Sequence, residues 1–173
     1  MTAEQIKAIT STQPPKTFPV DVSVIIIKSG YIETRHEDMF SYNIVQELKS
    51  SDKINRVTLV PGFLIPQTIT FDTLQELGIR SLSEYVLVFY LDASEFFRWT
   101  TVASSKYEIN SSISFILVDS GTSAILTADR LVSSEEYKEN LFKIGEQDKA
   151  RKQIFSEQAK LLAEKLDALF DGQ

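Results

Sequence analysis

The chain has 173 residues, a hydrophobic fraction of 43%, a formal net charge of −6 and no cysteine. That length suits one domain, with a core large enough to fold without the support of covalent cross-links. The absence of cysteine excludes disulfides, thiol catalysis and cysteine-ligated metals. The acidic balance argues against nucleic-acid binding, which needs a basic surface; the densest basic stretch, Lys149–Lys152, is interpreted as a solvated helix face and not as an anion site.

The first part of the chain divides into a lead-in and a strand. Met1–Ser11 is polar, and the three prolines among residues 14–19 favour an extended linker. Val20–Lys28 is a nearly continuous run of β-branched residues, which is typical of a central strand covered on both faces. The sequence therefore predicts a flexible or extended segment over 1–19 and a single domain over 20–173.

Two helices and a second strand are predicted next. Glu37–Ser50 is predicted as an amphipathic helix, because its apolar residues recur every four positions. Arg56–Ile65 is predicted to contain a second strand, Val57–Val60, followed by Pro61-Gly62; Phe63–Ile65 are expected to re-enter the core before Pro66. A short helix follows over Thr70–Leu77, with Thr70 placed to cap its start and Gly78 placed to end it.

Four further strands are predicted after this helix. Glu84–Asp92 is the third strand and Phe96–Val102 is a candidate fourth. Lys106–Asp119 alternates apolar and polar residues, which indicates a long strand with one face more exposed to solvent than the other. Asp119 begins an Asp-Ser-Gly-Thr turn, so Ser123–Val132 is expected to return as the antiparallel partner of the preceding strand.

The remainder, Ser134–Phe170, is predicted as helical, with Gly145 as a possible break. The apolar stripe of its second half is expected to dock on a sheet, and pairing with another helix is the alternative. The element order is β-α-β-α-β-β-β-β-α. The fold class is therefore α/β (α+β): a mixed sheet with helices packed on it and a long final helix.

Histidine chemistry has little support in the sequence. His36 is the single histidine, it lies in a polar segment predicted as a loop, and no Gly-x-Ser-x-Gly motif supplies a nucleophile for it. A metal site built on Glu33, His36, Glu37 and Asp38 matches neither a zinc pattern nor an EF-hand. No catalytic residue and no metal ligand is therefore assigned.

Cofactor and acid–base sites are equally unsupported. The chain has neither of the glycine-rich phosphate-binding motifs, so no cofactor is expected. Asp92, Glu95, Glu108 and Asp119 lie at or near strand positions, where a carboxylate pair for glycoside chemistry is conceivable. Turn residues or solvated strand positions are the preferred interpretation of all four.

An aromatic and basic cluster is the candidate partner surface. Phe96, Phe97, Arg98 and Trp99 are consecutive, and Trp and Arg are enriched at interface hot spots. On a strand Phe97 and Trp99 would share one face, so the alternative is that both simply face the core.

Three segments resemble the curli-secretion lipoprotein family. They are Leu74-x-x-Leu-Gly78 followed by the strand Glu84–Tyr90, the stretch Ile113–Thr122, and the helix Ala159–Leu166. The layout over roughly 20–170 is also similar to the amino-terminal domain of the Tol-Pal propeller protein. The chain departs from the family pattern at Ser83-Glu84, where Ala-Asp is expected, and in the turn, where Ser-Gly-Thr replaces Thr-Gly.

The resemblance implies a non-catalytic, envelope-facing domain that binds other envelope proteins or itself. It also implies a periplasmic or outer-membrane location, with a lipid anchor upstream. Met1–Gln5 lacks the pattern of a signal peptide, so the expectation is either a separate leader with a lipidated cysteine or a cytoplasmic protein. The alternative function is a small-ligand carrier or sensor, with a pocket between the sheet and the final helix.

Overall fold

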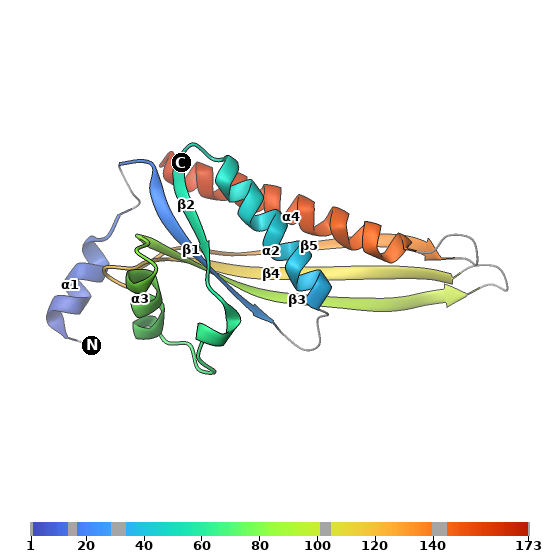
Figure 1. Ribbon diagram of the computed structural model, residues 1–173, viewed down its shortest axis with the longest axis horizontal. Coiled ribbons are helices and arrows are strands. Elements are labelled where there is room, and N and C mark those ends of the chain that lie inside the picture. The colour runs from blue at the N-terminus through green and yellow to red at the C-terminus, as the bar shows by residue number, and fades with distance from the viewer. Residues whose placement is uncertain (1, 14–16, 29–33, 101–104, 140–144, 173) are drawn as a thin grey trace.

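A computed structural model describes residues 2–13, 17–28, 34–100, 105–139 and 145–172, with the side chains of 34–36, 93–100, 105 and 139 outside the description. Its elements are helices packed on a mixed sheet, as the sequence predicts (Figure 1). In chain order they are α1 Ala3–Ser11, β1 Val20–Lys28, α2 Thr34–Ser50, β2 Ile54–Leu59, the 3-10 turn η1 Gly62–Leu64, α3 Phe71–Arg80, β3 Tyr85–Thr100, β4 Ser105–Asp119, β5 Ile125–Glu139 and α4 Glu146–Phe170.

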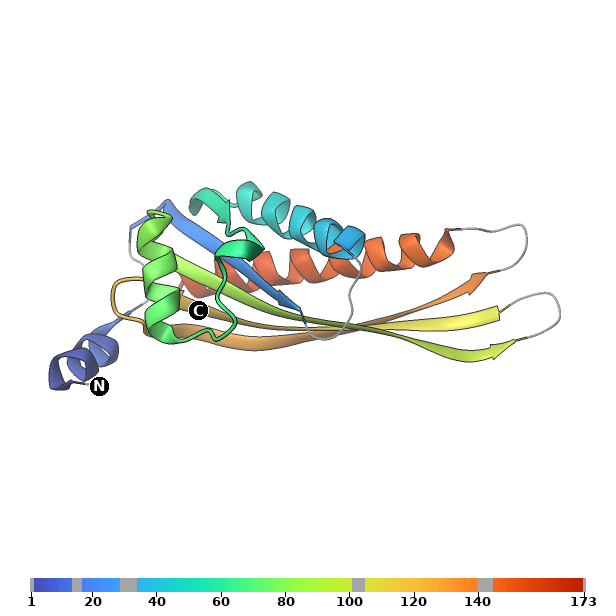
Figure 2. The ribbon, with the colours of Figure 1, turned by 60° about the horizontal axis from the view of Figure 1, so that its bottom comes forward.

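The five strands lie in the order β2-β1-β3-β4-β5. β1 is parallel to both β2 and β3, because α2 and α3 provide the crossovers that parallel pairs need. β3, β4 and β5 are antiparallel neighbours. Figure 1 and Figure 2 show these three long strands and α4 extending together past the end of β1.

Helices α2 and α4 cover one face of the sheet. Their apolar stripes meet the strands at Phe40, Phe89 and Phe155, which are at most 1% exposed. The ring of Phe40 lies 5.7 Å from that of Phe89 and 5.6 Å from that of Phe155, both edge to face. Burial of one such side chain contributes about 1.5–3 kcal/mol, so these three rings help to hold the two helices to the sheet. The docking of α4 on the sheet is confirmed.

Helix α3 covers the opposite face. Its Leu74 and Leu77 are buried against Ile25, Val86 and Val118 of the sheet. The Thr70 side chain accepts a hydrogen bond from the Thr73 backbone N–H at 3.2 Å, which confirms the predicted cap. β1 is therefore covered on both faces, as its β-branched composition predicts.

Gly78 does not end α3, and that prediction is wrong. The helix continues to Arg80, and a Cβ at position 78 would lie 2.2 Å from the Ser120 Oγ and 2.9 Å from Val86 Cγ2. Glycine is needed here because the helix approaches the sheet closely, and not because the chain turns.

Two boundaries in the second half were also predicted wrongly. β3 runs without interruption to Thr100, so Phe96–Val102 is not a separate fourth strand in the described residues. β5 continues to Glu139, and the final helix begins only after Gly145, whose φ is 92°. In both places pairing with the long strand β4 extends a segment whose local composition favours a turn or a helix.

The amino-terminal segment, predicted as flexible or extended, contains the helix α1. Thr2 and Gln5 form a reciprocal capping box at its start. No residue of α1 is fully buried, so it lies on the surface of the body. The division at residue 19 stays a prediction.

Candidate functional site

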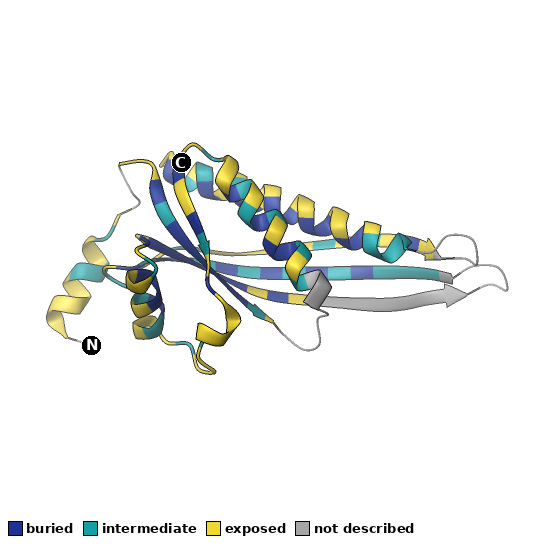
Figure 3. Cartoon of the chain, viewed as in Figure 1, coloured by how far each residue is buried: buried dark blue, intermediate teal, exposed yellow. Residues whose placement is uncertain are grey.

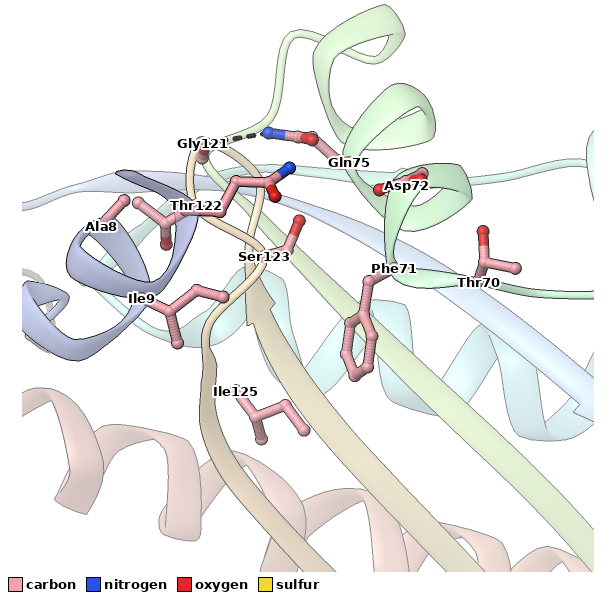
Figure 4. Close-up of a pocket in the computed structure, with 11 residues that line it drawn as sticks. Ala8, Ile9, Thr70, Phe71, Asp72, Gln75, Gly121, Thr122, Ser123 and Ile125 are labelled. Atoms are coloured by element: carbon pink, nitrogen blue, oxygen red, sulfur yellow. Dashed lines mark hydrogen bonds between the residues drawn. The ribbon is translucent and has the colours of Figure 1, made fainter. Parts of the chain in front are cut away.

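A groove of about 750 Å³ lies between α1, the start of α3 and the β4–β5 turn (Figure 4). Its size is within the usual range of ligand and peptide sites. Eleven residues line it: Gln5, Ala8, Ile9, Thr70, Phe71, Asp72, Gln75, Gly121, Thr122, Ser123 and Ile125.

Helix α1 forms one wall and is fixed at its carboxyl end. The Thr12 hydroxyl donates to the Thr122 hydroxyl at 2.8 Å, joining the end of the helix to the β4–β5 turn. Ala8 and Ile9 are half-buried on the side that faces the groove, while Ile6 is 47% exposed. The wall is therefore an amphipathic helix held by few contacts.

The floor is the β4–β5 turn, which its own hydrogen bonds make rigid. The Asp119 carboxylate accepts from the Gly121 N–H at 3.0 Å, the Thr122 N–H at 2.7 Å and the Thr122 hydroxyl at 2.8 Å. The Gln75 amide of α3 donates to the Gly121 carbonyl at 2.9 Å, which fixes the turn to the opposite wall. Asp119 is thus confirmed as a turn residue.

The groove has an apolar lower part and a polar rim. Figure 4 shows the side chains of Ile9, Phe71 and Ile125 around one opening, and Phe71 and Ile125 are 47% and 49% exposed. Asp72 and Ser123 contribute a carboxylate and a hydroxyl, and no lysine or arginine is among the described residues that line the groove. This composition suits a neutral or basic amphipathic segment, because an anion would meet only Asp72 as a charged group.

Two ionisable side chains of the sheet have pKa values that differ from their ordinary ones. Burial, assisted by the nearby charges of Asp119 and Glu84, raises the pKa of Tyr85 to about 12. On the outer strand, the hydrogen bond from Lys165 and then that from the Arg130 backbone hold the pKa of Asp129 below its ordinary value. Neither group is poised for proton transfer near neutral pH.

A second hollow, of about 470 Å³, lies between β4, β5 and the first turns of α4. This is where the carrier alternative places a pocket, but Tyr137 is the one aromatic residue among the charged and polar side chains that line it. Further along α4, the interface between the helix and the sheet is filled by Ile154, Phe155 and Leu162, each 1% exposed. Arg151 of the basic stretch is also buried, so this face of the helix is only partly solvated.

The predicted partner cluster lies at the far end of the sheet. Phe96 pairs with Glu108, Phe97 with Tyr107 and Trp99 with Lys106, and the register shifts between Phe97 and Trp99. The side chains of Phe96–Trp99 lie outside the described residues, so their role as a contact surface stays a prediction.

The other chemical candidates do not come together in the described part of the chain. His36 lies in the first turn of α2 and not in a loop, which corrects that prediction, and its side chain is outside the description. Among the described residues no three His, Asp or Glu side chains gather as a metal site would require. Within the same ranges, none of the helices combines the length and apolar content needed to cross a bilayer.

The groove is not predictable from the sequence, because its walls come from three distant segments. Thr2-Ala-Glu-Gln5 carries the capping-box pattern, which could have indicated α1. Nothing in the sequence brings Ile9, Phe71 and Ile125 together, because only the tertiary structure does so.

Comparisons with known proteins return solved structures only: no protein-family model and no curated protein matches significantly. A minor lipoprotein from Acinetobacter baumannii is 9% identical, with 87% of this chain and 94% of that chain covered and a TM-score of 0.50. A protein from Caulobacter crescentus CB15 that is assigned as a lipoprotein is 14% identical, with 98% and 97% covered and a TM-score of 0.52. A Helicobacter pylori protein assigned as a homolog of the neuraminyllactose-binding hemagglutinin is 14% identical, with 94% and 96% covered and a TM-score of 0.55.

The chain has a fold that bacterial lipoproteins adopt. This lipoprotein-like fold spans nearly the whole of each compared chain, and it accounts for the layout noted in the sequence. The specific resemblance to curli-secretion and Tol-Pal proteins stays a prediction.

Proposed function

We propose that this chain is a non-catalytic domain of the bacterial cell envelope, anchored by lipid upstream, that assembles with other envelope proteins through the groove between α1 and α3. The observation that carries the proposal is the fold, which lipoproteins from two bacteria share over most of their length.

The groove supports a binding role by its chemistry. Phe71 and Ile125 are about half exposed, and both line the groove. Partly exposed apolar side chains beneath a polar rim are the usual arrangement of a protein contact site. The groups that line the groove form no nucleophile–base pair, so binding is the activity they suit.

The partner segment that fits is amphipathic and neutral or basic. Its apolar side chains would contact Ile9, Phe71 and Ile125, and a cation would approach Asp72. Exchanging Phe71→Ser removes the largest apolar contact and is expected to weaken association about tenfold or more. Phe71 is 47% exposed, so the fold should tolerate this change.

A carrier function is the second candidate, and the groove is also its best site. Its volume would accommodate a small amphipathic ligand, whereas the charged hollow beside α4 would not. Native mass spectrometry of protein purified from cells separates the two: a retained small molecule favours the carrier, and a retained protein favours assembly.

The envelope location is tested by introducing one cysteine into this cysteine-free chain. Ser156 on the exposed side of α4 is changed to Cys in the native gene, and whole cells are treated with a maleimide that crosses the outer membrane but not the inner one. The proposal predicts labelling before cell lysis. Labelling only after lysis would place the chain in the cytoplasm and refute the proposal.

A further inference from the structure

Residues 57–71 contain no Asp, Glu, Lys or Arg, in a chain in which these residues make up 24%. Four of the large apolar side chains in this run are exposed. Phe71, at 47%, lines the groove described above, and the other three are Leu59 at 43%, Phe63 at 87% and Leu64 at 53%. We call these three residues the apolar projection. Figure 3 shows the turn η1 and the chain after it as an exposed edge of the body.

The prediction that Phe63 and Leu64 re-enter the core is wrong: they are exposed between residues that do pack into it. Val60 is 6% exposed, and its N–H donates to the Val24 carbonyl at 2.9 Å, which extends the β1–β2 pairing. Ile65 and Ile69, which follow the projection, pack against the core under α3. Phe63 and Leu64 therefore cannot be buried by a simple rearrangement of the loop.

The backbone of this turn is partly satisfied by its own hydrogen bonds. The Leu64 N–H donates to the Pro61 carbonyl at 2.9 Å, and the Ile65 N–H donates to the Gly62 carbonyl at 3.1 Å. Pro61 and Pro66 carry no N–H at all. A turn that enters an apolar medium is less costly when it satisfies its own polar groups, and this one does so for two of the four N–H groups between the two prolines.

We propose that the apolar projection inserts into the surface of a lipid bilayer. The inference rests on the proposed function, which places the chain beside a membrane. Lipid is favoured over a protein partner because the run carries no charged side chain, whereas a protein contact normally has a polar rim. The net charge of −6 gives no attraction to anionic lipid, so insertion is expected in zwitterionic bilayers and to be independent of salt.

The test uses one tryptophan as a depth probe. Phe63→Trp is made in a Trp99→Phe background, which removes the single native tryptophan. An amino-terminal histidine tag attaches the protein to phosphatidylcholine vesicles that contain a nickel-chelating lipid and lipids brominated on their acyl chains. Emission from position 63 is expected to fall about twofold or more relative to vesicles without bromine, because bromine quenches only a tryptophan within the acyl-chain region.

Val132→Trp in the same background is the matched control, because Val132 is 68% exposed on β5 and lies outside the uncharged run. It is expected to remain unquenched. Adding Leu59→Ser and Leu64→Ser to the Phe63→Trp protein should abolish the quenching there.

Equal quenching at positions 63 and 132, or none at either, overturns the proposal. The tryptophan emission of the Phe63→Trp protein is also measured at several protein concentrations without vesicles. If it changes with concentration, and vesicles do not quench it, the projection makes a protein contact. That result would overturn the proposal as well. Failure here leaves the envelope location standing, because the cysteine-labelling experiment measures that separately.

Discussion

Gly78→Ala tests the packing of α3 against the sheet. The new methyl group would lie 2.2 Å from Ser120 Oγ, 2.8 Å from Ser120 Cβ and 2.9 Å from Val86 Cγ2. Favourable carbon contacts begin near about 3.5 Å, so the helix or the turn must move. Rotation of the hydroxyl relieves only the shortest of these contacts.

The expected change in the free energy of unfolding is the difference of two effects. Overpacking costs about 1–3 kcal/mol, and a position with three close atoms belongs at the upper end. Alanine in place of glycine inside a helix stabilises the folded state by about 1 kcal/mol, which offsets part of this cost. The net loss is therefore about 2 kcal/mol, which for a chain of this size lowers Tm by about 4–8 °C.

Urea unfolding followed by circular dichroism measures this loss directly. In Gly78→Ala/Ser120→Gly the two Ser120 contacts disappear, and the double variant should recover at least about 1 kcal/mol relative to additivity. Gly62→Ala is the matched control, because nothing lies within 4 Å of its Cβ position, and it should be neutral. A Gly78→Ala protein as stable as the parent would refute the reasoning.

Three further changes probe the cap, a buried polar contact and a buried phenol. Thr70→Ala removes the bond to the Thr73 N–H and should cost about 1 kcal/mol in urea unfolding; no loss would show that the cap contributes nothing. Gln158→Leu should cost about 1–3 kcal/mol, because Gln158 is fully buried and hydrogen-bonded to the Ser111 hydroxyl and carbonyl at 3.0 and 3.2 Å. Ser111→Ala in the Gln158→Leu background should recover part of that cost, and additive losses would contradict the pairing. Burial raises the pKa of Tyr85 from 10.0 to about 12, so the contribution of Tyr85 to stability should be constant below pH 10 and decline toward pH 12 as the unfolded phenol ionises first. Tyr85→Phe should remove the tyrosinate absorbance step near pH 12; a step near pH 10 in the parent for this residue would refute the burial.

The segments predicted correctly are those whose side-chain period matches their final environment. The β-branched run Val20–Lys28 became a central strand, and the four-residue apolar repeat of α2 became a helix facing the sheet. The turn around Asp119 was predictable because its hydrogen bonds are local to that turn. In these segments local preference and tertiary packing agree.

The errors lie where tertiary pairing overrides local preference. Ser133–Glu136 resembles the start of a helix, but these residues pair with β4 and remain extended. Asp92–Glu95 resembles a turn, but it is an inner part of β3, bonded to β4. Because β4 is long, it determines the length of both neighbours, and a single sequence does not show that dependence.

The groove between α1 and α3 is the surface on which the proposed function depends most. Its apolar side chains come from residues far apart in the chain, and they gather only after folding. The most direct measurement is photo-cross-linking in intact cells from benzoylphenylalanine at position 71, with position 132, which is also exposed, as the control. The proposal predicts a discrete adduct with an envelope protein from position 71 and none from position 132. The absence of an adduct at 71, or the same set of adducts from both positions, would contradict the assignment of the groove as the binding site.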